Sequence, residues 1–239
     1  MFIEKIMTIK ILFPLVLILF LQKIISLYFT NFDLFGDEAQ YWLWSKDLDY
    51  GYFSKPPLLA WIIALYSNVF DDSLFSLKLI PAFTYIFTSW AVFSLCKNIG
   101  LKPDNSFECS LLFLLMPAVT FSSFIISTDI FLLLFWTLSL NELVIIKKTK
   151  SFKNFLMFGI FIGLAFLSKY AAVYFIICLI VYIFLDKDFR NFFLKNYLGF
   201  CLSFTCVILI LLPNLIWNFN NGWVTLQHTS DNANFTNIN

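Results

Sequence analysis

The residues best suited to chemistry are concentrated between positions 33 and 61, directly after an apolar stretch. This segment holds five carboxylates, two lysines and eight aromatic residues. Its adjacent acids, Asp37 and Glu38, lie at the expected edge of a membrane, where a carboxylate is costly to desolvate unless it is paired or bound to a metal. A carboxylate at that place could act as a general base toward a hydroxyl group. The alternative is a solvated helix start, because acids favour a first helical turn.

Lys55 is the second candidate, and it directly precedes Pro56 and Pro57. The two prolines fix the backbone, so the ammonium would be held in place. A fixed ammonium at the depth of the lipid headgroups is suited to bind a phosphate as a point charge. A lysine that extends from an interfacial helix toward water would produce the same pattern. The residues alone leave both interpretations open.

Three isolated residues complete the set of candidates. Asp129 lies in a short turn between two apolar runs, where it could take part in chemistry or only cap the following helix. Lys169 lies at a similar turn and is either functional or interfacial. His228 is the only histidine; it could carry a proton or bind a metal, although a lone histidine is more often neither.

The composition indicates which solvent surrounds the elements that position these residues. Sixty per cent of the 239 residues are apolar and 13% are charged, and the mean hydropathy is +0.83. Soluble domains carry about 25% charged residues. A lipid bilayer is therefore the expected solvent. A backbone in hydrocarbon must satisfy its own hydrogen bonds, and the alternating pattern of a barrel is absent, so we predict an all-α membrane protein.

The apolar runs predict a polytopic bundle of about seven transmembrane helices. Pro117 is expected to kink the third helix, and Gly159 and Gly163 form a pair of small residues that permits close helix packing. Residues 57–70 are too short for a full crossing and are expected to form an interfacial helix in the first outer loop. The predicted spans cover residues 9–29, 74–95, 107–126, 130–146, 155–167, 171–185 and 197–217.

The basic residues predict the orientation. In alternate loops counted from the N-terminus, eleven Lys and Arg residues fall on one side and four on the other. The first side, which includes the N-terminus, is therefore expected in the cytoplasm, and the first outer loop (30–73) in the periplasm. One long tilted helix over 155–185 would reverse everything downstream. We prefer two crossings there, because the basic segments 147–153 and 187–195 then share a face.

Taken in order, these residues resemble a known family. Residues 37–42 (DEAQYW) and 51–58 (GYFSKPPL) resemble the first outer loop of the dolichyl-phosphate-mannose-protein mannosyltransferase-like membrane enzymes, which include the bacterial aminoarabinose transferases acting on lipid A. Three later segments fit the bacterial branch in the same order: 127–129 (STD), 167–170 (LSKY), and 213–218 (PNLIWN) with 222–223 (GW). The resemblance covers roughly residues 30 to 228.

The resemblance implies the membrane glycosyltransferase architecture called GT-C. In that family a sugar arrives on a polyprenyl phosphate and passes to a lipid, glycan or protein acceptor on the periplasmic side of the bacterial inner membrane. Asp37 matches the catalytic carboxylate of the acidic pair, and Asp129 matches a second acidic position near the active site. Lys55 matches a lysine that holds the donor phosphate.

The remaining expectations concern substrates and metals. Glu38 completes the catalytic acids, and Tyr41 and Tyr52 offer ring faces to a sugar. Substrate binding is also expected at Lys169 and His228. No cofactor follows with certainty, because an acid precedes the phosphate-binding lysine in the aminoarabinose transferases and Ser54 stands there in this chain; a divalent metal stays an open expectation. Membrane lipids are expected partners, and nucleic acid is not.

Two alternatives compete with a transferase. A transporter or flippase for a lipid-linked solute should carry ionisable residues near mid-span and broken helices in paired halves, whereas the acids here cluster outside the apolar runs. A non-catalytic subunit that binds polyprenyl lipids would keep the same motifs. Residues 1–239 are expected to form one transmembrane glycosyltransferase module whose periplasmic tail, 218–239, is truncated.

Overall fold

Every regular element in the described part of the chain is a helix. The computed structural model describes residues 14, 17–18, 20–29 and 33–232. Three helices are long and apolar enough to cross a membrane: α4 (Leu74–Asn98), α7 (Thr128–Thr149) and α11 (Tyr197–Asn220). A bent pair, Tyr170–Leu185 with α10 (Lys187–Lys195), raises the number to four if it forms one span. The all-helical prediction is confirmed, and three or four candidate spans are observed where about seven were predicted.

Shorter apolar helices account for the difference in number. Phe20–Phe29 forms a helix, while most of the remainder of the predicted first span lies outside the described residues. The third predicted span is divided into α5 (Pro103–Leu115) and α6 (Pro117–Ser122). The kink predicted at Pro117 is observed as a break between α5 and α6, and Pro117 is the first residue of α6, a position that favours proline because its missing N–H needs no partner there.

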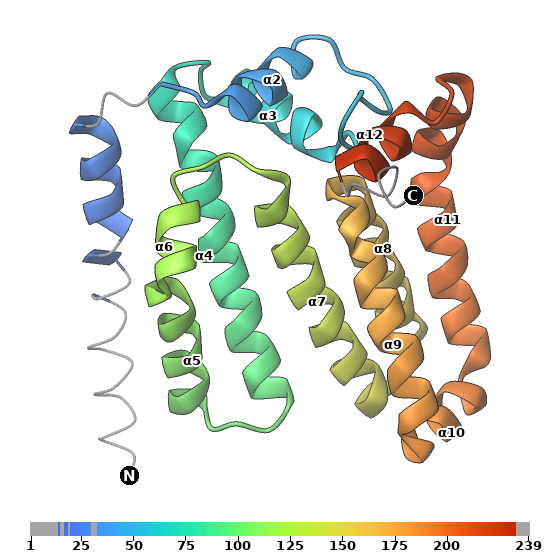
Figure 1. Ribbon diagram of the computed structural model, residues 1–239. Helices are drawn as coiled ribbons and strands as arrows, with labels where there is room; N and C mark the ends of the chain where they lie inside the picture. Colours follow the sequence, from blue (N-terminus) through green and yellow to red (C-terminus); the bar gives the residue numbers. More distant parts are fainter. Residues whose placement is uncertain (1–13, 15–16, 19, 30–32, 233–239) are drawn as a thin grey trace.

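The segment 152–185 forms two helices, as the sequence indicated. α8 (Phe152–Ser168) ends at Lys169, whose backbone is extended, and a short 3-10 turn (Tyr170–Ala172) leads into α9 (Val173–Leu185). Phe158 of α8 packs against Phe175 of α9, with ring centroids 6.2 Å apart; both helices are labelled in Figure 1. The turn at Lys169 consequently lies at the same end of the bundle as the start of α7.

Three short helices lie across that end of the bundle: α2 (Gly36–Trp44), α3 (Leu58–Val69) and α12 (Val224–Asn232) (Figure 1). α3 starts directly after Pro57, and its twelve residues agree with the predicted helix that is too short to cross. A buried cluster that includes Tyr41, Leu59, Ile80 and Ile130 packs α2 and α3 onto α4 and α7. Burial of this apolar surface fixes the capping helices to the bundle.

A second buried cluster holds the other half of the bundle together. It is built mainly of aromatic residues, among them Phe155, Phe158 and Phe200. α8 and α11 approach closely at Gly159: a Cβ at this position would overlap backbone and side-chain atoms of Ser203 and Cys206. The close packing predicted from the small-residue pair is therefore observed.

Candidate active site

Asp37, Lys55 and His228 line one cavity at the capped end of the bundle. The cavity has a volume of about 300 Å³, and Gln40, Phe53 and Ser54 complete its wall. Its residues come from α2, from the loop between α2 and α3, and from α12. Three of the residues predicted from sequence are thus brought together, and we call this space the Asp37 cavity.

The start of α2 places Asp37 in the Asp37 cavity. Asp37 lies in the first turn of α2, where the unpaired backbone N–H groups favour a negative charge. The side chain of its neighbour Glu38 is buried in the protein. It accepts a hydrogen bond from the backbone N–H of Phe35 at 2.8 Å. The adjacent acids therefore face different surroundings: Asp37 is exposed and Glu38 is buried.

The contacts of Glu38 join three elements. Its Oε2 accepts a hydrogen bond from Lys78 Nζ of α4 at 2.6 Å, and its Oε1 accepts one from the backbone N–H of Ile126 at 2.7 Å. The residue is 0% exposed. Pairing with an ammonium and with two N–H groups compensates the desolvation of a buried carboxylate. Lys78, which sequence reasoning did not single out, supplies that compensation.

Asp129 and Lys169 form an ion pair that joins the first turn of α7 to the turn that follows α8. Lys169 Nζ donates to Asp129 Oδ1 at 2.7 Å. Asp129 belongs to the first turn of α7, and Lys169 follows the last residue of α8. The side chains are 60% and 34% exposed, respectively. The sequence presented these two residues as unrelated; neither of them lines the Asp37 cavity.

Tyr41 lies within the electrostatic field of both acidic groups. The side chain is buried in the cluster beneath α2. Burial, and to a lesser degree the negative charges of Asp37 and Asp129, raise the pKa of the Tyr41 phenol to about 12. The phenol is therefore a neutral hydroxyl at physiological pH.

Tyr52 is buried in the loop and does not line the Asp37 cavity. Its ring stacks on Trp44 with ring centroids 4.6 Å apart and an angle of 7° between the planes. Its hydroxyl lies 3.0 Å from the carbonyl oxygen of Trp44 and accepts a hydrogen bond from the backbone N–H of Asp49 at 3.1 Å. Burial is the main cause of the raised pKa of Tyr52. The aromatic residue that lines the cavity is its neighbour Phe53. The Phe53 ring packs against the His228 ring, with ring centroids 4.8 Å apart.

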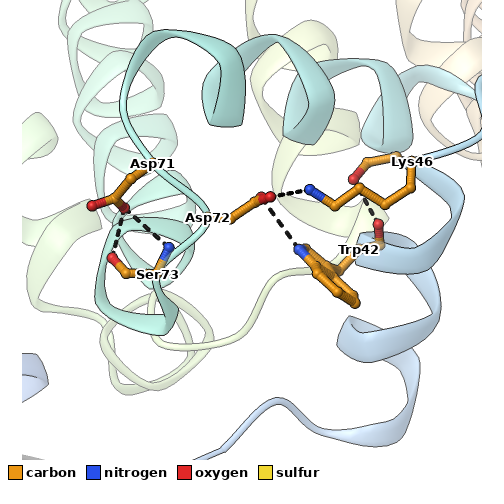
Figure 2. A network of polar contacts seen from close by, with 6 residues as sticks. Trp42, Lys46, Asp71, Asp72 and Ser73 are labelled. Atoms are coloured by element: carbon orange, nitrogen blue, oxygen red, sulfur yellow. Dashed lines mark hydrogen bonds and ion pairs between the residues drawn. The ribbon is translucent and has the colours of Figure 1, made fainter.

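A second polar contact, missed from the sequence, holds the other end of α2. Asp72 accepts a hydrogen bond from Trp42 Nε1 at 3.3 Å and forms an ion pair with Lys46 (Figure 2). The hydrogen bond from the Lys46 ammonium is the main cause of the lowered pKa of Asp72. Asp72 lies in the connection between α3 and α4, so both ends of α2 are joined to α4 or to its start.

The residues at the Asp37 cavity do not form a complete metal site. Asp37 and His228 are two ligand types that metals favour, but Ser54 occupies the position where the resemblance leads one to expect a further acid. The described residues contain no group of three or more His, Cys, Asp or Glu side chains close enough to hold a metal ion. Zinc sites usually use at least three protein side chains, so we derive no step through a metal.

Comparison with known proteins shows the family of the chain. The chain is 28% identical over 219 residues to a lipid A galacturonosyltransferase, RgtD, of Rhizobium johnstonii. The alignment covers 91% of this chain and 45% of that relative, so the chain spans less than half of the relative's length. No solved structure matches the chain. A sequence profile described as dolichyl-phosphate-mannose-protein mannosyltransferase matches residues 54–217, which is more than half of the chain. This multi-pass membrane protein therefore belongs to the dolichyl-phosphate-mannose-protein mannosyltransferase family of GT-C glycosyltransferases.

Proposed function

We propose that the chain is the catalytic membrane module of a glycosyltransferase that uses a polyprenyl-phosphate sugar as its donor. The observation that carries the proposal is the Asp37 cavity, where a carboxylate and an ammonium from separate segments face the same space. A transferase with a lipid-phosphate leaving group needs both groups, one for the attacking hydroxyl and one for the departing phosphate. Family membership supports this chemistry.

In the proposed mechanism Asp37 orients the acceptor hydroxyl and takes its proton. The hydroxyl oxygen forms a bond to the anomeric carbon as the bond from that carbon to the phosphate oxygen breaks. The electron pair leaves with the lipid phosphate, whose negative charge Lys55 stabilises. A direct displacement of this kind inverts the anomeric centre. His228 lines the same cavity and can offer a ring nitrogen to the phosphate.

The other candidate residues have supporting roles in this proposal. Glu38 positions α2 and thereby Asp37, because its carboxylate is committed to Lys78 and to backbone N–H groups. The partly exposed Asp129–Lys169 pair is the proposed site for the transferred sugar or the acceptor, and the buried ring of Tyr41 supports α2 from beneath. Tyr52 shapes the loop that presents Lys55.

The proposed topology follows the positive-inside rule and the arrangement of the helices. About seven crossings would place the N-terminus in the cytoplasm, together with the connections at 99–102 and 150–151 and α10. The end that carries α2, α3 and α12 would then face the periplasm of a bacterial inner membrane. In this orientation the Asp37 cavity is open to acceptors of the cell envelope. The acceptor class we propose is a lipid A-type glycolipid, in line with the name of the relative.

The direct test is a transfer assay in membranes that contain the chain. Polyprenyl phosphates that carry a radiolabelled sugar are added together with lipid A, and the lipid products are separated. The proposal expects label to be covalently attached to the acceptor only in membranes that contain the chain. A transporter or a lipid-binding subunit would move or retain the donor without forming a new glycosidic bond, and that result would overturn the proposal.

A further inference from the structure

The last two turns of α11 carry polar side chains within an otherwise apolar helix. Asn214 and Asn218 are each 1% exposed. A buried amide is costly unless it is hydrogen-bonded, so the partners of these side chains indicate what the end of α11 does. None of the roles assigned above involves them.

One set of partners belongs to the loop that precedes Lys55. Asn214 Nδ2 donates to the carbonyl oxygen of Tyr50 at 2.6 Å, and Trp217 Nε1 donates to Asp49 Oδ2 at 2.6 Å. Gly51 lies so close to the Trp217 indole that a Cβ at position 51 would overlap the six-membered ring of the indole. Residues 49–51 are therefore held against α11 by two hydrogen bonds and by a contact that only glycine permits.

A further hydrogen bond within the loop connects this segment to Lys55. The backbone N–H of Tyr52 donates to the carbonyl oxygen of Lys55 at 3.2 Å. The carbonyl oxygen of Tyr52 accepts a hydrogen bond from Thr225 Oγ1 of α12 at 2.7 Å, and Thr225 is 0% exposed. α12 also supplies His228. The 49–55 loop and α12 are thus joined to each other and to the end of α11.

The second set of partners belongs to the turn that carries Lys169. The hydroxyl of Tyr170 donates to Asn214 Oδ1 at 2.8 Å and accepts a hydrogen bond from Asn218 Nδ2 at 2.9 Å. Tyr170 directly follows Lys169, which is paired with Asp129. One amide, that of Asn214, therefore contacts both the 49–55 loop and the Lys169 turn.

We propose that Asn214 is a positioning residue that fixes the 49–55 loop, and with it Lys55, relative to the Lys169–Asp129 pair. Asn214 touches neither the Asp37 cavity nor a reacting group; it acts through the backbone of Tyr50 and the hydroxyl of Tyr170. This inference rests on the proposed function for its catalytic consequence. Its structural part is independent, because the same contacts set the rigidity of the loop whether or not the chain is a transferase.

The experiment measures amide hydrogen exchange of the full chain in lipid nanodiscs. The variants are Asn214→Leu, which replaces the amide by an apolar group of similar size, and Tyr170→Phe, which removes only the hydroxyl. The control is Asn221→Ala at the same helix end, where an exposed amide that donates to the carbonyl oxygen of Trp217 at 2.8 Å is lost. Asn214→Leu loses the hydrogen bonds to Tyr50 and Tyr170, and Tyr170→Phe loses those to Asn214 and Asn218. Exchange of residues 49–55 is expected to speed by about 3- to 10-fold in both variants, and the control is expected to match the wild type.

Unchanged exchange in the 49–55 loop of both variants would overturn the positioning role. If Asn214→Leu does not fold, Tyr170→Phe alone decides. In the transfer assay, a displaced Lys55 should raise the KM for the lipid-phosphate donor by about 10-fold and leave the pH profile of kcat unaltered. An unaltered donor KM would remove the catalytic consequence. Absence of transfer by the wild type would contradict the proposed function and leave the exchange result standing as the test of positioning.

Discussion

Glu38 Oε2 and Lys78 Nζ lie 2.6 Å apart, and their side chains are 1% and 5% exposed. This ion pair joins the first turn of α2, which carries Asp37, to α4. Breaking a buried pair from one side leaves an unpaired charge in an apolar setting, which is strongly unfavourable. The location of Asp37 thus depends on a lysine that lies forty positions after Glu38 in the sequence.

Replacing Lys78 by Met should destabilise the protein by about 3–5 kcal/mol, because the Glu38 carboxylate would stay buried without its partner. The measurement is thermal or denaturant unfolding in detergent. Lys46→Met is the matched control, since it breaks the more exposed pair with Asp72 and should cost less than about 1 kcal/mol. The double variant Glu38→Gln/Lys78→Met should recover part of the loss. Equal effects of Lys78→Met and Lys46→Met would contradict the account of the buried pair.

Much of the fold follows from local sequence patterns. Apolar runs predict the helices, Pro117 predicts the break between α5 and α6, and the two short runs around Lys169 predict the division between α8 and α9. These features depend on backbone hydrogen bonds and on the chemistry of single residues, which a short stretch of sequence determines. The number of crossings is harder to predict, because helices such as α8, with seventeen residues, are near the minimum length for a span.

The partners within the site could not be read from the sequence. The acidic pair and Lys55 were evident candidates, but the pairing of Lys169 with Asp129 and the approach of His228 to Asp37 depend on which helix ends meet. That choice is made by packing between elements distant in sequence. The two adjacent acids, alike in sequence, differ in surroundings because Lys78 and the backbone N–H of Ile126 donate hydrogen bonds to Glu38.

Tyr41 should make stability depend on alkaline pH. Burial and the charges of Asp37 and Asp129 raise its pKa to about 12, above the unfolded value of about 10. The folded state therefore keeps a proton that the unfolded state loses, so this contribution to stability is complete below about pH 10 and is lost as pH rises toward about 12. The free energy of unfolding of the wild type and of Tyr41→Phe is measured in detergent across this pH range. It should decline less steeply with rising pH in the variant. Identical declines would contradict the raised pKa.

Lys169 should matter for activity more than for stability. Its ion pair with Asp129 is partly exposed, and such pairs contribute less than about 1 kcal/mol. If the pair contacts the sugar or the acceptor, Lys169→Gln should lower kcat/KM by about 10- to 100-fold, as expected for the loss of a charged hydrogen bond. Transfer rates and melting temperatures are measured on the same preparation. A variant that melts earlier and loses activity in proportion would show a structural role instead.

Chelation of zinc should leave transfer intact, because Asp37 and His228 provide two side-chain ligands at the cavity and Ser54 adds a weak one. Membranes are treated with EDTA and a zinc-selective chelator, and initial rates are compared with untreated membranes. The account predicts equal rates. A rate that falls and returns on addition of Zn²⁺ or Mg²⁺ would require a metal that binds together with the substrate.

The central claim is that Asp37 takes the proton of the acceptor hydroxyl. The most direct measurement compares the initial rate of sugar transfer by the wild type, Asp37→Asn and Asp33→Asn, at equal protein levels in the membrane. Asp33 is exposed in the segment just before α2 and serves as the matched control. The account predicts that Asp37→Asn lowers the rate by about 10²- to 10⁴-fold, with membrane insertion intact, and that Asp33→Asn transfers sugar at the wild-type rate. Full activity of Asp37→Asn would contradict it.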